Sequence, residues 1–376
     1  MAFALTGARV FDGESIREGL AVVIDGPRIV DVGPEHALAP DLDQRPLRGG
    51  LLAPGFIDVQ VNGGGGALLN DNPTIDTVRH IAESHRKFGT TGMLPTVITD
   101  APEVLSKAIA AVKAARNSNI PGILGIHIEG PFLDTERKGA HEAKFIRAMT
   151  QEDVERIIAL DCGSIMLTLA PNRVSPDLIR ALTEKGVLVS LGHSEAQHSE
   201  VIAALASGAR AFTHVFNAMR QMTGREPGMV GAALSDRESF CGLIADGYHV
   251  HDAAMKVALA AKRKDRLMLI TDAMPSAAGG PDHFELQGRM VERENGRLQL
   301  EDGTLAGSDL TMDVAVRYCV SKLGVAIGKT LRMASLNPAM FLRRDKELGR
   351  IAPGYLASLV HLSDDLEVLQ TWIDGK

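Results

Sequence analysis

Residues 165–215 read IMLTLAPNRVSPDLIRALTEKGVLVSLGHSEAQHSEVIAALASGARAFTHV. Three short apolar runs alternate here with two segments of helical spacing, in the order 165–170, 175–185, 187–191, 194–207 and 209–215. A strand, a helix and a second strand in this order form a βαβ unit, in which the two strands lie parallel in one sheet. The stretch therefore predicts an α/β fold.

The same alternation extends in both directions along the chain. Five more apolar runs occur at 56–61, 92–97, 123–129, 241–246 and 267–272, and four more helical segments at 74–88, 101–115, 150–160 and 253–262. Eight strands that alternate with helices close into a (β/α)8 TIM barrel of about 250 residues in the usual case. We assign the barrel to residues 53–344.

The two ends of the chain have a different pattern. Short alternating segments punctuated by Gly and Pro occur at 8–11, 20–24, 28–32, 358–362 and 368–373. This pattern is typical of β-hairpins. We expect residues 1–52 and 345–376 to pair into one small β-sandwich domain beside the barrel. Residues 284–305, after the eighth strand, predict a further hairpin with its turn at Asn295-Gly296.

Composition and charge exclude several classes of protein. Hydrophobic residues make up 45% and charged residues 23%, which is typical of a soluble globular chain and excludes disorder and coiled coil. With 40 basic and 47 acidic residues and no long basic cluster, nucleic acid is not an expected partner. No apolar run approaches the about 18 residues of a membrane span, and the N-terminus lacks the basic start of a signal peptide. We expect a cytoplasmic protein whose Cys162, Cys241 and Cys319 are buried and reduced.

Polar residues gather at the C-terminal ends of the predicted strands, where (β/α)8 barrels carry their catalytic groups. Of the 12 histidines, four fall on or just after a strand end and one lies in the loop after the third strand: His127, His193, His214, His249 and His141. Carboxylates close the third and eighth strands at Glu129 and Asp272. This pattern predicts an active site at that mouth of the barrel.

Two imidazoles and one carboxylate form a catalytic zinc set that leaves one position for water. Glu129, His193 and His214 fit this set because each ends a different strand. Asp272 would then take the proton of the water and deliver it to the leaving group. The alternative is that each residue is only a hydrogen-bonded polar group at a strand end. His127 shares the strand face of Glu129, and we expect it to pack beneath the site rather than bind metal.

Several ordered motifs resemble the amidohydrolase superfamily, and within it the N-acetylglucosamine-6-phosphate deacetylases. The matching stretches are PGFIDVQVNG at 54–63, HIEGPF at 127–132, KGAH at 138–141, LGHS at 191–194, THVFNAM at 213–219, ADGYH at 245–249, TDA at 271–273, LAGS at 305–308 and NPA at 337–339. The resemblance implies hydrolysis of the acetamide of N-acetyl-D-glucosamine 6-phosphate, in amino-sugar catabolism and cell-wall sugar recycling. It also implies that Glu129, His193 and His214 bind one divalent metal ion, with Asp272 as general base and acid. Zn²⁺ is the first choice for the ion, and Fe²⁺, Co²⁺ or Mn²⁺ are alternatives.

The resemblance further implies the residues that bind substrate. His141 and His249 would contact the sugar and its acetamide, and Asn217 and Ala218 would hold the substrate near its phosphate. Arg225 would pair with the phosphate, as a guanidinium does well. Members of the family are commonly homodimers, so Arg225 is expected to reach the site of the neighbouring subunit. The alternative for Arg225 is a solvated loop residue paired with Glu226.

Two departures from the family pattern narrow these expectations. Many amidohydrolases end the first strand in His-x-His and bind two metals, whereas Gln60 and Asn62 stand here. Amides are poor substitutes for imidazole at zinc, so we expect a single tightly bound ion with these residues lining the site. Asn172 stands where related deacetylases often have Glu, which argues against a carboxylate role there.

Two other functions stay open from the sequence alone. One is a deacetylase for the galactosamine epimer or another deacylase of the superfamily, since the choice of epimer depends on contacts with one hydroxyl. The other is a barrel scaffold without catalysis. A scaffold is expected to lose its ligands or its base, but Glu129, His193, His214 and Asp272 are all present.

Overall fold

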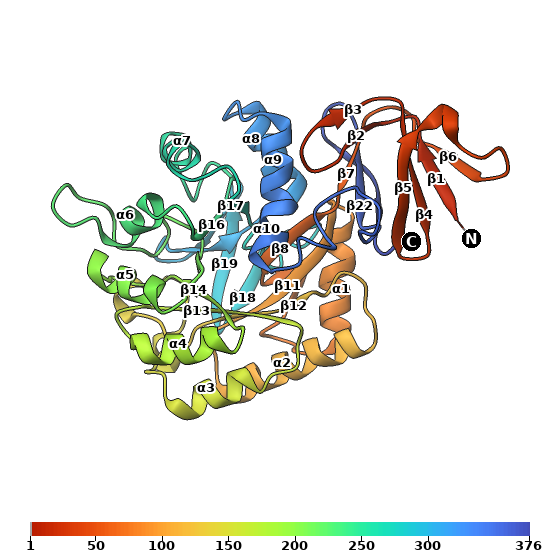
Figure 1. The fold of residues 1–376 in the computed structure, drawn as a ribbon. Helices are drawn as coiled ribbons and strands as arrows, with labels where there is room; N and C mark the ends of the chain where they lie inside the picture. Colours follow the sequence, from red (N-terminus) through yellow and green to blue (C-terminus); the bar gives the residue numbers. More distant parts are fainter. Residues whose placement is uncertain (1) are drawn as a thin grey trace.

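The computed structural model describes residues 2–376, and its centre is a parallel barrel (Figure 1). Eight strands lie side by side in chain order: β8 (Phe56–Val61), β11 (Thr90–Ile98), β12 (Gly125–Glu129), β13 (Ser164–Leu169), β14 (Leu188–Leu191), β15 (Ala211–Phe212), β16 (Phe240–Leu243) and β17 (Leu267–Leu269). Each neighbouring pair is parallel. A parallel bridge between Val61 and Ala273 joins the two ends of the row. The predicted (β/α)8 barrel is confirmed.

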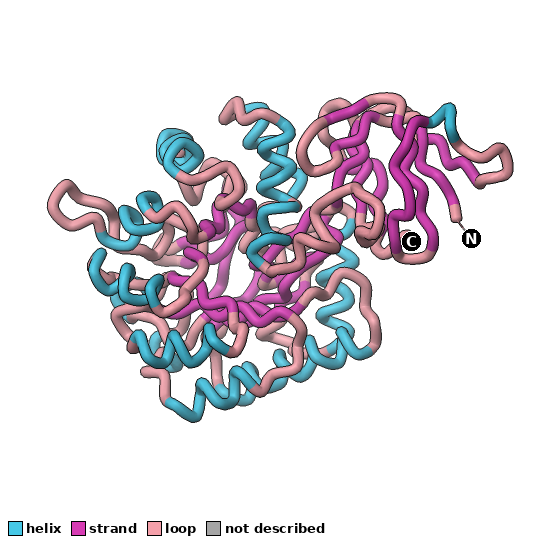
Figure 2. Tube along the Cα trace, in the orientation of Figure 1, coloured by secondary structure: helices cyan, strands magenta, loops and turns pink. Residues whose placement is uncertain are grey.

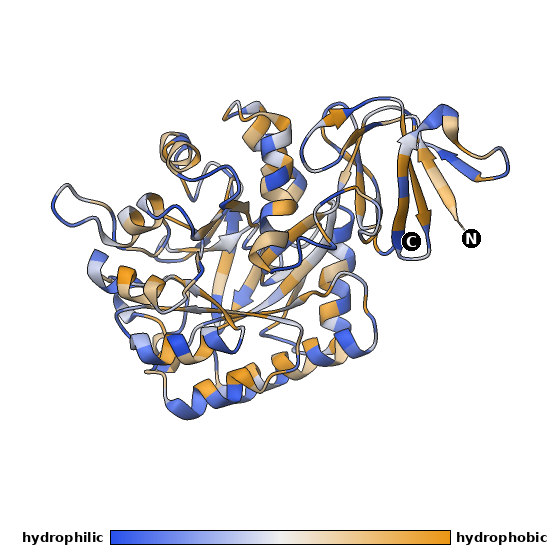
Figure 3. Ribbon diagram, in the orientation of Figure 1, coloured by the Kyte–Doolittle hydropathy of each residue, from blue (hydrophilic) through white to orange (hydrophobic). Residues whose placement is uncertain are grey.

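Helices surround the barrel on its outer side (Figure 2). They are α1 (Ile75–Arg86), α2 (Pro102–Asn117), α3 (Gln151–Ile158), α4 (Pro176–Glu184), α5 (His198–Ala206), α6 (Gly228–Ser235), α7 (Asp252–Ala261), α8 (Met312–Ser321), α9 (Ile327–Ala334) and α10 (Leu336–Phe341), with 3-10 turns at Glu35–Ala37, Thr135–Arg137 and Ala143–Phe145. Hydrophobic and hydrophilic residues alternate along α2, α3 and α4, so one face of each can pack on the sheet (Figure 3). Thr150 begins α3 with a capping box, and Ser175 followed by Pro176 begins α4.

Several boundaries differ from the sequence prediction for local reasons. The apolar runs predict the sixth and eighth strands over 209–215 and 267–272, but β15 ends at Phe212 and β17 ends at Leu269. His214 and Asp272 have left-handed backbones, with φ of 30° and 53°, which a strand cannot contain. The helix expected over 194–207 begins at His198, because the backbone of Ser194 pairs with Ala218 instead.

Strands from both ends of the chain form the small β unit beside the barrel (Figure 1). One sheet has the order β5 (Arg28–Pro34), β4 (Leu20–Asp25), β1 (Phe3–Thr6) and β6 (Asp43–Pro46); the other has β23 (Val368–Trp372), β22 (Leu359–Leu362), β7 (Leu51–Pro54), β2 (Arg9–Phe11) and β3 (Ile16–Arg17). Phe3, Leu5, Leu52 and Trp372 share one buried cluster that joins the two sheets. The exact division of the chain at residues 53 and 344 stays a prediction.

A four-stranded antiparallel sheet lies between β17 and α8. It consists of β18 (His283–Leu286), β19 (Arg289–Glu294), β20 (Arg297–Leu300) and β21 (Leu305–Ser308); a short pair, β9 (Gly63–Gly64) and β10 (Ala67–Leu68), follows β8. The predicted turn at Asn295-Gly296 is present, and both residues have positive φ. The predicted hairpin is confirmed as β19 and β20, and one further strand extends the sheet on each side, β18 beside β19 and β21 beside β20. Ser308 in β21 bridges Ala273, which brings this sheet to the mouth of the barrel.

The three cysteines are buried and unpaired, as predicted. Cys162, Cys241 and Cys319 are free thiols in buried positions, and burial raises the pKa of Cys241 to about 11 and that of Cys319 to about 12. Across residues 2–376, none of the helices combines the length and the apolar character that a bilayer crossing needs.

Candidate active site

A carboxylate and two imidazoles converge at the mouth of the barrel. Glu129 ends β12, His193 follows β14 and His214 follows β15, so three separate strands deliver them. One ligand atom from each residue lies within 4.8 Å of the others, and all three side chains are buried. Within residues 2–376 this is the one group of three or more such side chains close enough to share an ion. The structure thus brings together the residues that the sequence motifs assign to a metal.

The orientation of the rings fits a divalent cation. Nδ1–H of His193 donates to the carbonyl oxygen of Arg137 at 2.9 Å, so the lone pair of its Nε2 points the other way. That Nε2 and the Nε2 of His214 each lie 3.2 Å from Oε1 of Glu129, and they lie 3.0 Å from each other. Three ligand atoms that face one another at such distances suit a single ion held by two imidazoles and a carboxylate.

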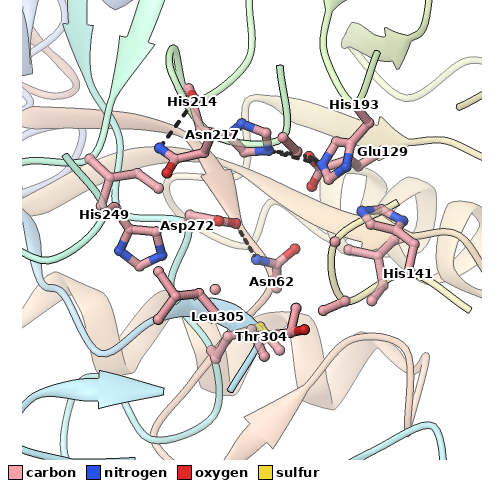
Figure 4. Close-up of a pocket in the computed structure, with 18 of the residues that line it drawn as sticks. Asn62, Glu129, His141, His193, His214, Asn217, His249, Asp272, Thr304 and Leu305 are labelled. Atoms are coloured by element: carbon pink, nitrogen blue, oxygen red, sulfur yellow. Dashed lines mark hydrogen bonds and ion pairs between the residues drawn. The ribbon is translucent and has the colours of Figure 1, made fainter. Parts of the chain in front are cut away.

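Asp272 lies beside this cluster and is held by two amides. Nδ2 of Asn62 donates to its Oδ1 at 2.8 Å (Figure 4). Nε2 of Gln60 donates to the same oxygen at 3.0 Å. Nε2 of Gln60 also lies 3.2 Å and 3.1 Å from the two carboxylate oxygens of Glu129. Gln60 therefore stands between the two carboxylates and donates to both, and it reduces their repulsion.

The charges in the cluster shift the pKa values of its members. Burial acts to raise the pKa of Glu129, but the hydrogen bonds and charges of His193 and His214 outweigh it and hold that pKa well below its usual range. Burial acts to lower the pKa of His214, and the Glu129 carboxylate reverses this and raises it. Burial, followed by the charge of Glu129, raises the pKa of Asp272 to about 6. A carboxyl group with this pKa can both accept and return a proton near neutral pH.

Several residues of the site have left-handed backbones. Besides His214 and Asp272, φ is 46° at His193, 80° at Phe216 and 50° at Ala218. Left-handed geometry in residues other than glycine costs free energy and is concentrated at functional sites. These bends turn the side chains that follow the strands into the mouth of the barrel.

The cluster opens into a cavity of about 380 Å³. The following predicted site residues line it: Asn62, Glu129, His141, His193, His214, Asn217, Ala218, His249 and Asp272 (Figure 4). Gln60 lies behind them, since it is buried and contacts Glu129 and Asp272. Arg137, Leu286 and Thr304 also line the cavity, although the sequence motifs did not indicate them. Leu286 and Thr304 belong to the insertion after the eighth strand. The sequence signal for them is that this insertion begins directly after the loop of Asp272.

Two further histidines face the cavity in fixed orientations. Nδ1–H of His249 donates to Oδ2 of Asp246 at 2.6 Å, which leaves Nε2 directed toward the cavity beside Asp272 (Figure 4). His141 packs edge-on against His193, with ring centroids 4.5 Å apart, and its buried Nδ1 has no hydrogen-bond partner among residues 2–376. Burial and the charge of His193 hold the pKa of His141 well below its usual range, so the ring is neutral.

Three residues discussed from the sequence lie outside the cavity. Arg225 is exposed on the loop before α6, and Glu226 accepts from the backbone N–H groups of His198 and Gly228. His127 is buried and hydrogen-bonds with the hydroxyls of Thr96 and Thr168, and burial lowers its pKa to about 4. His127 therefore packs beneath the site as a neutral residue, as the sequence predicted.

A (β/α)8 barrel with this ligand set and an adjacent carboxylate is a metal-dependent hydrolase of the barrel type. The model of the amidohydrolase family matches residues 51–376, and the model of the NagA composite domain matches residues 2–52. The chain belongs to the amidohydrolase family, whose members generally use a divalent metal.

Named relatives cover most of the chain. An N-acetylgalactosamine-6-phosphate deacetylase of Shewanella sp. (strain ANA-3) is 44% identical over 88% of this chain and 84% of its own. The N-acetylglucosamine-6-phosphate deacetylase of Rattus norvegicus is 37% identical over 99% of this chain and 94% of its own. The resemblance to these deacetylases is therefore confirmed.

Two solved structures have the same fold from end to end. The N-acetylglucosamine-6-phosphate deacetylase of Pasteurella multocida superposes with a TM-score of 0.97, at 33% identity, and covers 100% of this chain and 99% of its own. An aspartate-to-alanine mutant of the Mycobacterium smegmatis deacetylase, in complex with N-acetyl-D-glucosamine 6-phosphate, superposes with a TM-score of 0.93, at 30% identity, over 100% and 98% of the two chains.

Proposed function

We propose that this chain hydrolyses the acetamide of N-acetyl-D-glucosamine 6-phosphate to D-glucosamine 6-phosphate and acetate, in amino-sugar catabolism and cell-wall sugar recycling. The observation that carries the proposal is that Glu129, His193, His214 and Asp272 are buried side chains that meet in one cavity. The deacetylase named for this sugar in rat and the Mycobacterium smegmatis structure with the sugar bound support the choice of substrate. The free, buried thiols support a cytoplasmic location.

Glu129, His193 and His214 would hold one divalent ion, with Zn²⁺ as the first choice and Fe²⁺, Co²⁺ or Mn²⁺ as alternatives. When bound, such an ion polarises the amide carbonyl and lowers the pKa of water. The amide of Gln60 supports a single ion rather than two, because it stands between Glu129 and Asp272. Asn62 lines the same side of the site and offers an amide in place of an imidazole.

Asp272 would act as the general base and then the general acid. The side-chain amides of Gln60 and Asn62 both donate to Oδ1 of Asp272. Within residues 2–376 no group donates to its Oδ2, so this oxygen is free to take a proton from the attacking water. Its pKa of about 6 lets it accept that proton and then pass it to the departing amine. Water and the amide are thereby converted to acetate and the free amino sugar.

The remaining predicted residues would bind the sugar. His249 and the neutral His141 present ring nitrogens to the cavity and would contact the sugar and its acetamide. Asn217 and Ala218 line the same wall and would hold the substrate near its phosphate. Arg225 is exposed and outside the cavity of its own chain. It would therefore pair with the phosphate in the neighbouring subunit of a homodimer.

The galactosamine epimer is the second candidate substrate. It is favoured by one specific observation, the 44% identity with the Shewanella enzyme named for that sugar. Acetate release from the two 6-phosphates, measured side by side with the metal-loaded chain, decides between them. We expect a higher kcat/KM on the glucosamine compound, and a large loss of activity on both compounds in Asp272→Asn. A higher kcat/KM on the galactosamine compound would show that the epimer is the substrate. The absence of acetate release from either compound would refute both candidate functions.

A further inference from the structure

Asp134 lies in the loop that follows Glu129 and is almost completely buried, with 1% of its surface exposed. It contacts the loop of His193 through its backbone. Its N–H donates to the carbonyl oxygen of His193 at 2.9 Å, and its own carbonyl oxygen accepts from the N–H of Arg137 at 3.0 Å. The carbonyl of Arg137 in turn accepts from Nδ1–H of His193. The 134–137 turn therefore fixes both the backbone and the ring of His193.

The carboxylate of Asp134 holds this turn in place. Oδ1 accepts from Nη2 of Arg173 at 2.8 Å, and Oδ2 accepts from the side-chain amide of Asn172. The backbone N–H groups of Glu136 and Glu195 also point at the carboxylate, at 3.3 Å and 3.4 Å. The carboxyl group thus ties the loops after β12, β13 and β14 to one another.

Asn172 provides a second connection to the loop that carries His193. Its Oδ1 accepts a hydrogen bond from the hydroxyl of Ser194 at 2.6 Å, and Ser194 directly follows His193. Asn172 must therefore donate to Asp134 and accept from Ser194 at the same time, which a side-chain amide can do. A carboxylate at position 172 would have no proton to donate and would face the carboxylate of Asp134, where like charges repel in a buried setting.

We propose that Asp134 and Asn172 are positioning residues that hold His193 in the orientation in which it binds metal. Neither side chain lines the cavity, so both act through His193. The inference rests on the proposed function in one respect, that His193 is a metal ligand. The arrangement corresponds to the outer shell that orients ligating histidines in metal sites.

The test compares the metal affinity of wild type, Asn172→Asp and Asp134→Asn. Zn²⁺ affinity is measured by competition with a chelator, and the visible spectrum of the Co²⁺-loaded protein reports the geometry of the ligands. We expect a roughly 10- to 100-fold loss of affinity in each single variant, together with an altered Co²⁺ spectrum. The double variant, Asp134→Asn with Asn172→Asp, exchanges the amide and the carboxylate between the two positions. It should recover part of the affinity, because a donor and an acceptor again face each other.

Asn70→Asp is the matched control. Asn70 is also buried, in the loop between β8 and α1, and its Nδ2 donates to the carboxylate of Asp100 at 2.9 Å, but it has no hydrogen bond to the loop of His193. The same substitution should leave Zn²⁺ affinity and the Co²⁺ spectrum at wild-type values, even if it lowers the thermal midpoint. Circular dichroism verifies that each variant folds. If Asn172→Asp does not fold, the test uses Asp134→Asn, which preserves the shape of the side chain.

The outcomes separate this inference from the proposed function. Wild-type affinity and spectrum in both single variants would overturn the positioning role, as would an equal loss in Asn70→Asp. Failure of the wild-type chain itself to bind Zn²⁺ or Co²⁺ would contradict the proposed function and, with it, this inference.

Discussion

The side-chain amide of Gln60 donates to Asp272 across 3.0 Å, and the same nitrogen reaches both oxygens of Glu129. Removing this amide in Gln60→Ala leaves two buried carboxylates facing each other. The pKa of Asp272, already raised to about 6 by burial and Glu129, should then rise further. Because the base form exists only above its pKa, the acid limb of kcat/KM should move to higher pH.

Profiles of kcat/KM against pH for wild type and variant measure this shift. Gln44→Ala is the control, since Gln44 is exposed in β6, which belongs to the small β unit and not to the barrel. An acid limb at the same pH in Gln60→Ala and wild type would contradict a role of Gln60 between the carboxylates.

Asp272→Asn should retain metal and bind substrate but lose most turnover. The amide keeps the shape of the side chain and cannot accept a proton, so kcat should fall by about 10²- to 10⁴-fold. Acetate release measures turnover, and elemental analysis verifies that the variant still holds its metal. Turnover near the wild-type value would rule out Asp272 as the base.

Removal of the metal should abolish activity, and His193→Asn should not retain the ion. The variant loses one of the three ligand atoms that lie within 4.8 Å of one another. After chelation, added Zn²⁺ should restore acetate release to the wild type but not to the variant. His36→Asn, at an exposed position, is the control that should behave as wild type. Two tightly held ions per wild-type chain would contradict the prediction of a single metal.

Asp58 should make stability depend on pH. It is fully buried beneath the site, and its carboxylate accepts from the hydroxyl of Thr271 at 2.6 Å. Burial raises its pKa to about 7, compared with about 3.8 in the unfolded chain. Between pH of about 4 and 7, Asp58 is ionised in the unfolded chain but still protonated in the folded chain. The free energy of unfolding should therefore fall as pH rises over this interval, by a few kcal/mol at most.

Urea unfolding at several pH values measures this effect. In Asp58→Asn the side chain is neutral throughout, so the difference between wild type and variant should grow over this interval and stay constant above pH 7. A difference that does not vary with pH would show that Asp58 does not titrate there.

Arg225→Ala should weaken substrate binding more than turnover. Loss of a guanidinium that pairs with the phosphate should raise KM roughly 10- to 100-fold and change kcat little. Arg237→Ala, another exposed arginine, is the matched control and should leave KM unchanged. Sedimentation measures whether the chain is a dimer. A monomeric chain with an unchanged KM in Arg225→Ala would contradict both the dimer and its shared site.

The barrel and the identities of the residues at its mouth follow from the amino-acid sequence alone. The spacing of hydrophobic residues and the length of each run distinguish strands from helices. Parallel strands that follow one another in chain order must place Glu129, His193 and His214 at the same end of the barrel. The sequence motifs indicate the same residues, because metal binding and proton transfer depend on the type of side chain. The boundaries of β15 and β17 were less predictable, because left-handed bends at His214 and Asp272 do not appear in the hydrophobic pattern.

How these side chains meet is a property of the folded chain. That Gln60 stands between two carboxylates, and that Asp134 and Asn172 hold the loop of His193, depends on distances between residues 22 to 212 positions apart in the chain. The extra strands around the Asn295-Gly296 turn pair with their neighbours in the chain. The wall they add to the cavity depends on distant contacts, such as the hydrogen bond from the side-chain amide of Gln287 to the carbonyl oxygen of Thr99, 188 positions away. Such contacts follow from packing in three dimensions, which local patterns of hydrophobicity do not encode.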